Sequence, residues 1–248
     1  MSDELTTVPE VLPIEVLPEA ETYSKLGRWL YLFLVLVVSF GLFIWRSVSA
    51  LHVQKGTVPG TRSGSQGAGW IFAIVQELVG LLLLWFVLSR RRLRFRDIGL
   101  RWSFRDLGIG LVLVVTAYLT YFVGHFFVHW MHQAWFSSVT GGLTAREVYG
   151  HPSIIAIPYS LVSPFFEELI VRAYLMTEVR DLTGSWTLAA ALSVAVQTSY
   201  HLYYGWEEAI SLSFVFLVFS IFYARTRRAT PIVLGHGMWD LFELVRLW

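Results

Sequence analysis

Long apolar stretches constrain the fold of this chain more strongly than any other feature of its sequence. A helix needs roughly 20 consecutive apolar residues to cross a hydrocarbon layer about 30 Å thick. Apolar residues make up 55% of the 248 residues and charged residues only 15%, a balance that is unusual for a soluble domain of this length. The stretches are continuous, whereas the strands of a membrane β-barrel would alternate apolar and polar side chains. We therefore predict an all-α, polytopic transmembrane helix bundle.

About seven spans are expected, separated by segments that are rich in glycine, serine, threonine or arginine. They cover residues 29–46, 67–89, 108–130, 152–177, 185–204, 208–224 and 230–247. Residues 1–24 are acidic and rich in proline and threonine, which is typical of a disordered tail. Residues 25–248 are expected to form one transmembrane domain, with residues 52–69 as an external loop.

Lysine and arginine residues gather in alternate loops and predict the orientation of the chain. The positively charged segments are 25–28, 90–105, 180 and 225–228. By the positive-inside rule, the N-terminus is expected in the cytoplasm and the C-terminus outside. We interpret the arginine run as a topology determinant and expect no nucleic-acid binding. The chain has no cysteine, which excludes thiolate nucleophiles and Cys-ligated zinc. Its compact size and arginine run fit the inner membrane of a prokaryote.

Ionisable residues inside three of the last four predicted spans are the main indication of function. Burying one such group in hydrocarbon costs roughly 2.5 to 3.5 kcal/mol on insertion scales, so these residues are expected to be functional. In the first group, Glu168 and Arg172 are four residues apart and share a helix face, where they can pair. Glu167 points about 100° away from Glu168 and lacks this cation, which suits it to general-base work. Pro164 can loosen the helix just before the pair.

Two histidines complete the group. His201 lies near the outer end of the next predicted span, and Gln197 lies one helical turn before it. His236 and Asp240 are again four residues apart, so they lie on one face of the last span. The two glycines that flank His236 permit a close approach of another helix or a local break in this one. These residues are therefore expected to converge on a polar cavity within the membrane.

Other polar residues in the apolar stretches compete with this group. Gln76 and Glu77 lie in the second span, and His125 and His129 share a face of the third. The two histidines could form a metal site, a proton path or a link between helices, but the glutamate of an HExxH motif is missing between them. We treat all four as secondary.

The order of the motifs resembles that of the CPBP family of intramembrane proteases. Glu-Glu-x-x-x-Arg, a histidine on the next span and His-x-x-x-Asp follow one another over about residues 150–245. The family includes type II CaaX prenyl proteases, bacteriocin-processing and immunity proteins, and abortive-infection proteins. The resemblance implies a helical bundle with a water-filled cavity. This part of the chain would then be the catalytic core.

The resemblance also implies a role for each motif residue. Glu167 with His201 would activate water, and His236 with Asp240 would bind the oxyanion or orient its donor. Glu168 and Arg172 would hold the first motif in place, with Gln197 as a further support.

Two residues depart from the family pattern. Gln197 occupies a position that is usually phenylalanine, and Asp240 replaces the commoner asparagine. Aspartate only accepts hydrogen bonds when ionised, so it would orient a charged His236 rather than donate to an oxyanion.

The motif residues allow a mechanism with a metal ion or one without. Glu167, His201 and His236 could hold zinc in a His₂Glu site. We favour a mechanism without metal or other cofactor, because each residue already has an acid–base role. The predicted function is hydrolysis of a peptide bond in a membrane-associated substrate, either prenylated or bearing a leader. The alternative is a non-catalytic immunity or peptide-binding protein of the same fold. A proton-coupled transporter is disfavoured because the sequence shows no inverted repeat.

Overall fold

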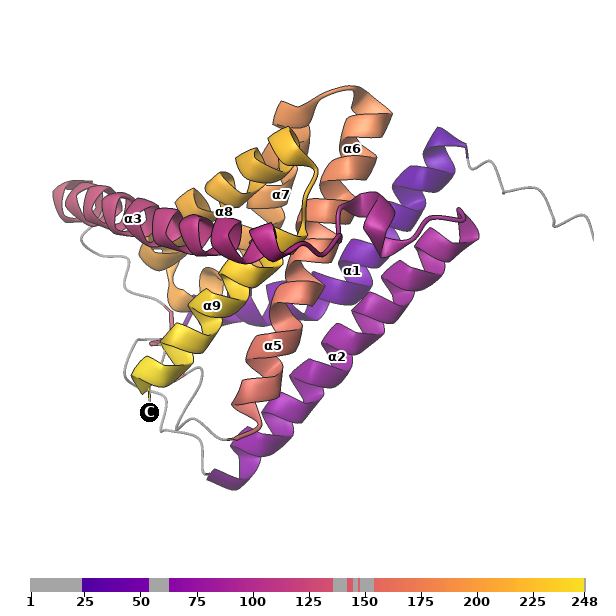
Figure 1. Ribbon diagram of the computed structural model, residues 1–248. Helices are drawn as coiled ribbons and strands as arrows, with labels where there is room; N and C mark the ends of the chain where they lie inside the picture. Colours follow the sequence, from indigo (N-terminus) through magenta and orange to yellow (C-terminus); the bar gives the residue numbers. More distant parts are fainter. Residues whose placement is uncertain (1–23, 54–62, 136–141, 145–146, 148–153, 248) are drawn as a thin grey trace, which may run out of the picture.

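The computed structural model describes residues 24–53, 63–135, 142–144, 147 and 154–247. Helices make up nearly all of these residues, and no strand occurs among them, which confirms the all-α fold class (Figure 1). Residues 1–23 of the predicted tail lie outside the described residues. In the part of the chain that the structure describes, four helical segments are long and apolar enough to cross a membrane: Lys25–Ala50, Ala68–Arg90, Phe104–Ala134 and Trp206–Thr226. The chain is therefore an integral membrane protein.

The helices follow the predicted spans with some changes at their ends. They are α1 (Lys25–Ala50), α2 (Ser63–Arg90), η1 (Phe95–Ile98), α3 (Phe104–Trp135), α5 (Ala156–Glu167), η2 (Glu168–Tyr174), α6 (Leu175–Thr183), α7 (Trp186–Tyr200), η3 (Leu202–Tyr204), α8 (Trp206–Thr226) and α9 (Thr230–Leu247). The predicted external loop 52–69 is wrong in its second half, because α2 begins at Ser63. The short η2 is a π-helical segment that joins α5 to α6 directly, so residues 156–183 form one helical unit.

Capping residues explain where two of these helices begin. The Ser24 hydroxyl accepts a hydrogen bond from the Gly27 amide at 3.1 Å, and Ser185 accepts one from Leu188 at 3.1 Å. Each bond satisfies an amide that has no partner within its own helix. Gly184 adopts a φ of 78°, a left-handed conformation that ends α6 one residue before the Ser185 cap. The turn between α6 and α7 is thus encoded by a Gly-Ser pair.

The helices pack in a ring around the π-helical segment. Neighbouring pairs around the ring are α1 with α2, α2 with α5, α5 with α9, α9 with α3, α3 with α8, α8 with α7, and α7 with α1. Figure 1 shows α3 crossing the direction of α2 and α5 rather than running parallel to them. All seven residues of η2 are buried. The first motif therefore lies at the centre of the bundle.

Glycines bring helices close together at two places near this centre. A Cβ atom at Gly80 would lie 2.5 Å from the Phe166 ring and 2.9 Å from the Ser39 hydroxyl, so α2 can approach α1 and α5 only with glycine there. On the other side, a Cβ at Gly235 would lie 3.0 Å from the carbonyl oxygen of Gly110. Gly235 therefore makes the close helix contact that the sequence predicted, and its partner is α3.

Charged side chains join the helix ends at one side of the bundle. Glu178 accepts from Arg28 Nε at 2.9 Å and also pairs with Arg91. Asp106 pairs with Arg228, which links the start of α3 to the segment after α8. These contacts place the arginine-rich segments on the same side. The sequence predicted that arrangement for cytoplasmic loops, and the membrane orientation itself stays a prediction.

Candidate active site

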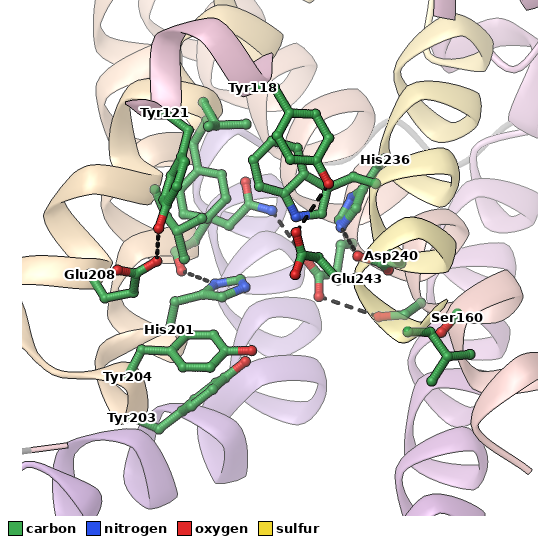
Figure 2. Close-up of a pocket in the computed structure, with 18 of the residues that line it drawn as sticks. Tyr118, Tyr121, Ser160, His201, Tyr203, Tyr204, Glu208, His236, Asp240 and Glu243 are labelled. Carbon is green, nitrogen blue, oxygen red and sulfur yellow. Dashed lines mark hydrogen bonds and ion pairs between the residues drawn. The ribbon is translucent and has the colours of Figure 1, made fainter. Parts of the chain in front are cut away.

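A cavity of about 470 Å³ opens between the helices of the ring. Residues from α2, α3, α5, α7, η3, α8 and α9 line it, and aromatic rings form much of its wall (Figure 2). Five of the motif residues contribute to the lining: Glu167, Gln197, His201, His236 and Asp240. His125, one of the secondary residues of the sequence, also lines the cavity. The structure thus brings residues of all three motifs to one polar cavity. Glu168 and Arg172 are fully buried behind that wall.

Glu167 is the last residue of α5, and three neutral donors surround its carboxylate. Oε2 accepts a hydrogen bond from the Tyr200 hydroxyl at 2.7 Å and another from Gln197 Nε2 at 2.9 Å. Oε1 accepts a longer bond from the Ser163 hydroxyl at 3.3 Å. Sequence reasoning missed Tyr200 and Ser163. A tyrosine near the end of an apolar helix resembles an ordinary interfacial aromatic residue, so its role had no signal in the sequence.

Glu168 and Arg172 form the predicted pair, with Arg172 Nε 3.6 Å from Glu168 Oε2. Both side chains are completely buried. The Arg172 guanidinium also donates to the Phe216 carbonyl at 3.3 Å and lies over the Phe216 ring. Neither side chain of this pair is exposed to water, so the pair is part of the packed centre of the bundle.

The helix type at this pair differs from the prediction. We expected an ordinary α-helix through the doublet, in which the two glutamates point about 100° apart. The π-helical segment begins at Glu168, directly after Glu167. Atoms of both carboxylates and of His236 lie within 4.8 Å of one another. A π-helical turn is wider than an α-turn and is frequent at functional sites.

His201 caps the C-terminus of α7, and its Nδ1 lies 2.9 Å from the Gln197 carbonyl oxygen. A carbonyl only accepts, so Nδ1 must carry the hydrogen. In the neutral ring, Nε2 then has the free lone pair. His201 lines the same cavity as Glu167. The Glu167 carboxylate accepts its hydrogen bonds from Ser163, Gln197 and Tyr200.

His236 contacts a carboxylate through each ring nitrogen. Its Nε2 lies 3.5 Å from Asp240 Oδ1, the residue that the four-residue spacing predicted as its partner. Its Nδ1 makes a shorter contact of 2.8 Å with Glu168 Oε1. The second contact joins α9 to η2. No spacing within one helix could have predicted it.

The cluster that could hold a metal differs from the predicted trio. Among the described residues, Glu167, Glu168 and His236 have ligand atoms close together, whereas we had named Glu167, His201 and His236. Two carboxylates and an imidazole are suitable ligands for several divalent metals. However, Glu168 already contacts Arg172 and His236. These partners compensate its charge, so the fit to a metal is poor and no step below uses one.

The secondary residues of the sequence have different surroundings. Glu77 is buried with one carboxylate oxygen that has no partner among the described residues. His129 Nδ1 lies 2.6 Å from Glu207, and His125 Nδ1 lies 3.5 Å from Glu208. These two contacts link α3 to the start of α8. His125 and His129 thus connect α3 with α8.

Two tyrosines of α3 also reach carboxylates across the cavity (Figure 2). Tyr121 donates to Glu208 at 2.5 Å, and Tyr118 donates to Glu243 at 3.1 Å. The Tyr118 ring stacks on Trp239, with centroids 3.9 Å apart and planes at 12°. The sequence analysis did not identify Tyr118 and Tyr121 as cavity residues, because the family motifs all lie on later helices.

One protein family matches this part of the chain. Residues 149–242 match the family described as type II CAAX prenyl endopeptidase Rce1-like. This part of the chain is therefore similar to that family. The match includes every motif residue and confirms the CPBP family predicted from the three motifs. No curated protein and no solved structure matches the chain.

The match to the type II CAAX prenyl endopeptidase family agrees with a membrane-embedded hydrolase. The matched region begins just before α5 and ends within α9. It therefore omits α1, α2 and α3, which nevertheless pack against the matched helices and complete the ring. The similarity to this family supports a CAAX-type protease.

Proposed function

We propose that this protein is an intramembrane endopeptidase that hydrolyses a peptide bond of a membrane-associated substrate, using water activated by Glu167 and His201. One observation carries the proposal. A carboxylate and two imidazoles, from α5, α7 and α9, line a single cavity of about 470 Å³ inside a membrane-embedded bundle. Similarity to a protease family supports the same assignment.

The first step is attack of water on the scissile carbonyl carbon. Glu167 takes one proton from the water, and Nε2 of His201 accepts a hydrogen bond from the other O–H and orients the molecule. The new bond forms between the water oxygen and the carbonyl carbon. The carbonyl oxygen becomes an oxyanion.

The oxyanion needs a donor in a site shielded from bulk water. The Nε2–H of a protonated His236 is suited to this role, because Glu168 holds the other ring nitrogen. Asp240 Oδ1 lies 3.5 Å from the same nitrogen, which is longer than a normal hydrogen bond, so this N–H can turn from Asp240 to the oxyanion when the oxyanion forms. When the tetrahedral intermediate collapses, Glu167 gives its proton to the leaving amine and the C–N bond breaks. This sequence consumes one water and restores Glu167 as a carboxylate.

The substrate is a peptide or protein segment held at the membrane, either prenylated at a CaaX-type C-terminus or bearing a leader. The apolar and aromatic lining of the cavity supports a substrate with apolar surface. We place the protein in the inner membrane of a prokaryote, with its N-terminus in the cytoplasm. The mechanism uses no metal, so hydrolysis should survive strong chelation.

Purified protein in lipid nanodiscs tests the proposal with two panels of peptides, one farnesylated at a CaaX end and one bearing a leader. Cleavage is measured by mass spectrometry in the presence of a chelator. Glu167→Gln should abolish cleavage while the melting temperature stays close to that of the parent protein. Glu207→Gln is the matched control, because Glu207 lies outside the cavity and contacts His129.

Two outcomes would contradict parts of this proposal. Loss of cleavage on chelation, with recovery on adding zinc, would replace the metal-free mechanism. Retained binding of a peptide without hydrolysis of any would favour the alternative, a non-catalytic immunity or peptide-binding protein with the same fold.

A further inference from the structure

The two oxygens of the Glu167 carboxylate have different surroundings. Oε2 accepts both short hydrogen bonds, from Tyr200 at 2.7 Å and from Gln197 at 2.9 Å. Oε1 receives only the 3.3 Å bond from Ser163. A carboxylate oxygen has two lone pairs in the plane of the group, and two donors occupy both of them on Oε2. The oxygen with capacity left to take a proton is therefore Oε1.

The two donors on Oε2 are held firmly by their own surroundings. Gln197 is completely buried, and the Tyr200 ring is stacked on Phe40 with centroids 4.7 Å apart and planes at 11°. Phe40 in turn packs against Phe166, the residue next to Glu167, at 4.8 Å. The Tyr200 hydroxyl thus reaches the carboxylate from a ring that has little room to turn. Buried donors held in this way fix the plane of the group they bind.

The same turn of α7 also fixes His201. The Gln197 carbonyl oxygen holds His201 Nδ1, while the Gln197 side chain holds Glu167. Gln197 therefore contacts both groups that the proposed mechanism assigns to water activation. The Tyr200 and His201 rings lie 4.7 Å apart, so the turn presents its three side chains as one packed unit.

We infer that Tyr200 and Gln197 are positioning residues that hold Glu167 by Oε2 and leave Oε1 as the oxygen that takes the proton from water. The inference rests on the proposed function and deepens it. It also gives a role to Gln197, the residue at which this chain departs from the usual phenylalanine. Reactivity depends strongly on the placement of the reacting group, and a misplacement of 1 Å can cost about a hundredfold in rate.

Two variants remove one donor each with little change of shape: Tyr200→Phe and Gln197→Met. For each, kcat should fall by roughly tenfold to a hundredfold while KM changes by less than about threefold, because only the orientation of the base is affected. Infrared difference spectroscopy against Glu167→Gln identifies the carboxyl vibration of Glu167. That band should move in both variants, which is a readout that does not need activity.

Tyr223→Phe is the matched control. The Tyr223 hydroxyl is also buried and hydrogen-bonded, to Thr177 at 2.9 Å and to the carbonyls of Ile98 and Ala173 at 3.0 and 3.1 Å. It lies outside the cavity lining. This variant should melt at a lower temperature, yet keep both the kcat of the folded protein and the Glu167 band unchanged.

The outcomes separate the inference from the proposed function. An unmoved Glu167 band in both variants, or an unchanged kcat in both, overturns the inference even if Glu167→Gln is inactive. Full activity of Glu167→Gln overturns the proposed function instead. If one variant does not fold, the other still decides, because each removes a separate bond to the same oxygen.

Discussion

His236 Nδ1 lies 2.8 Å from Glu168 Oε1, so the last helix of the bundle is tied directly to the π-helical segment at its centre. Glu168 also contacts Arg172, and His236 also contacts Asp240. These four residues form a continuous chain of alternating charge when His236 is protonated. Glu167 lies beside this chain and outside it. The arrangement leaves the Glu167 carboxylate with neutral hydrogen-bond donors only.

The buried pair should be essential for stability. Removing one partner of a buried ion pair leaves an uncompensated charge and typically costs about 3 to 5 kcal/mol. Glu168→Ala and Arg172→Ala should therefore reduce the yield of folded protein and lower its melting temperature in detergent. Asp181→Ala breaks ion pairs with Arg180 and Arg28, in which all three side chains are partly exposed, and should cost at most about 1 kcal/mol per pair. Equal melting temperatures for the three variants would show that the buried pair is not a structural element.

Asp240 should tolerate replacement by asparagine better than by alanine. The carboxylate contacts His236 Nε2 at 3.5 Å, and an amide oxygen can accept from the same ring. We expect Asp240→Asn to keep cleavage within about tenfold of the parent, whereas Asp240→Ala and His236→Ala lose about a hundredfold or more. The measurement is kcat on one peptide in nanodiscs. An asparagine variant as inactive as His236→Ala would mean that the negative charge itself is required.

Gly80 should be intolerant of even one added methyl group. A Cβ at this position would lie 2.5 Å from the Phe166 ring, and overpacking a close contact typically costs about 1 to 3 kcal/mol. Gly80→Ala is therefore expected to melt at a lower temperature. Gly108→Ala in α3 is the control, because a Cβ there would have no neighbour within 4 Å, and alanine favours the helix. A destabilised control with an unaffected Gly80→Ala would contradict the packing described for α2.

The orientation in the membrane can be measured directly, because the chain has no cysteine. A single cysteine at Arg96, which belongs to the arginine-rich side of the bundle, should be protected from an impermeant maleimide in intact cells. A cysteine at Leu143 should be labelled, because the Leu143 amide donates to the Tyr203 carbonyl in η3, which precedes α8 at the end opposite Arg228. Labelling of the first and protection of the second would reverse the predicted orientation.

Much of the fold was predictable, because each membrane-spanning helix is a continuous apolar stretch of the sequence. The apolar stretches located the helices to within a few residues, and four-residue spacing identified Glu168 with Arg172 and His236 with Asp240. These are contacts within one helix, where geometry follows from the count of residues.

Contacts between helices were not predictable in this way. The bonds from Tyr200 to Glu167 and from His236 to Glu168 depend on how the helices pack. The π-helical segment also escaped prediction, because its apolar residues fit an α-helix equally well. Residues of α3 such as Tyr118 and Tyr121 line the cavity, but nothing in their spacing distinguishes them from lipid-facing aromatics.

The stacking of Tyr200 on Phe40 has a consequence for how this protein can be divided or transplanted. Phe40 lies in α1, more than a hundred residues before the region of family similarity begins. A fragment cut at residue 149 would retain every motif residue and yet lose the surface against which the Tyr200 ring rests. Grafting the motifs into another bundle would meet the same obstacle. A piece of the protein that keeps this support for Tyr200 therefore has to include α1, which carries no motif.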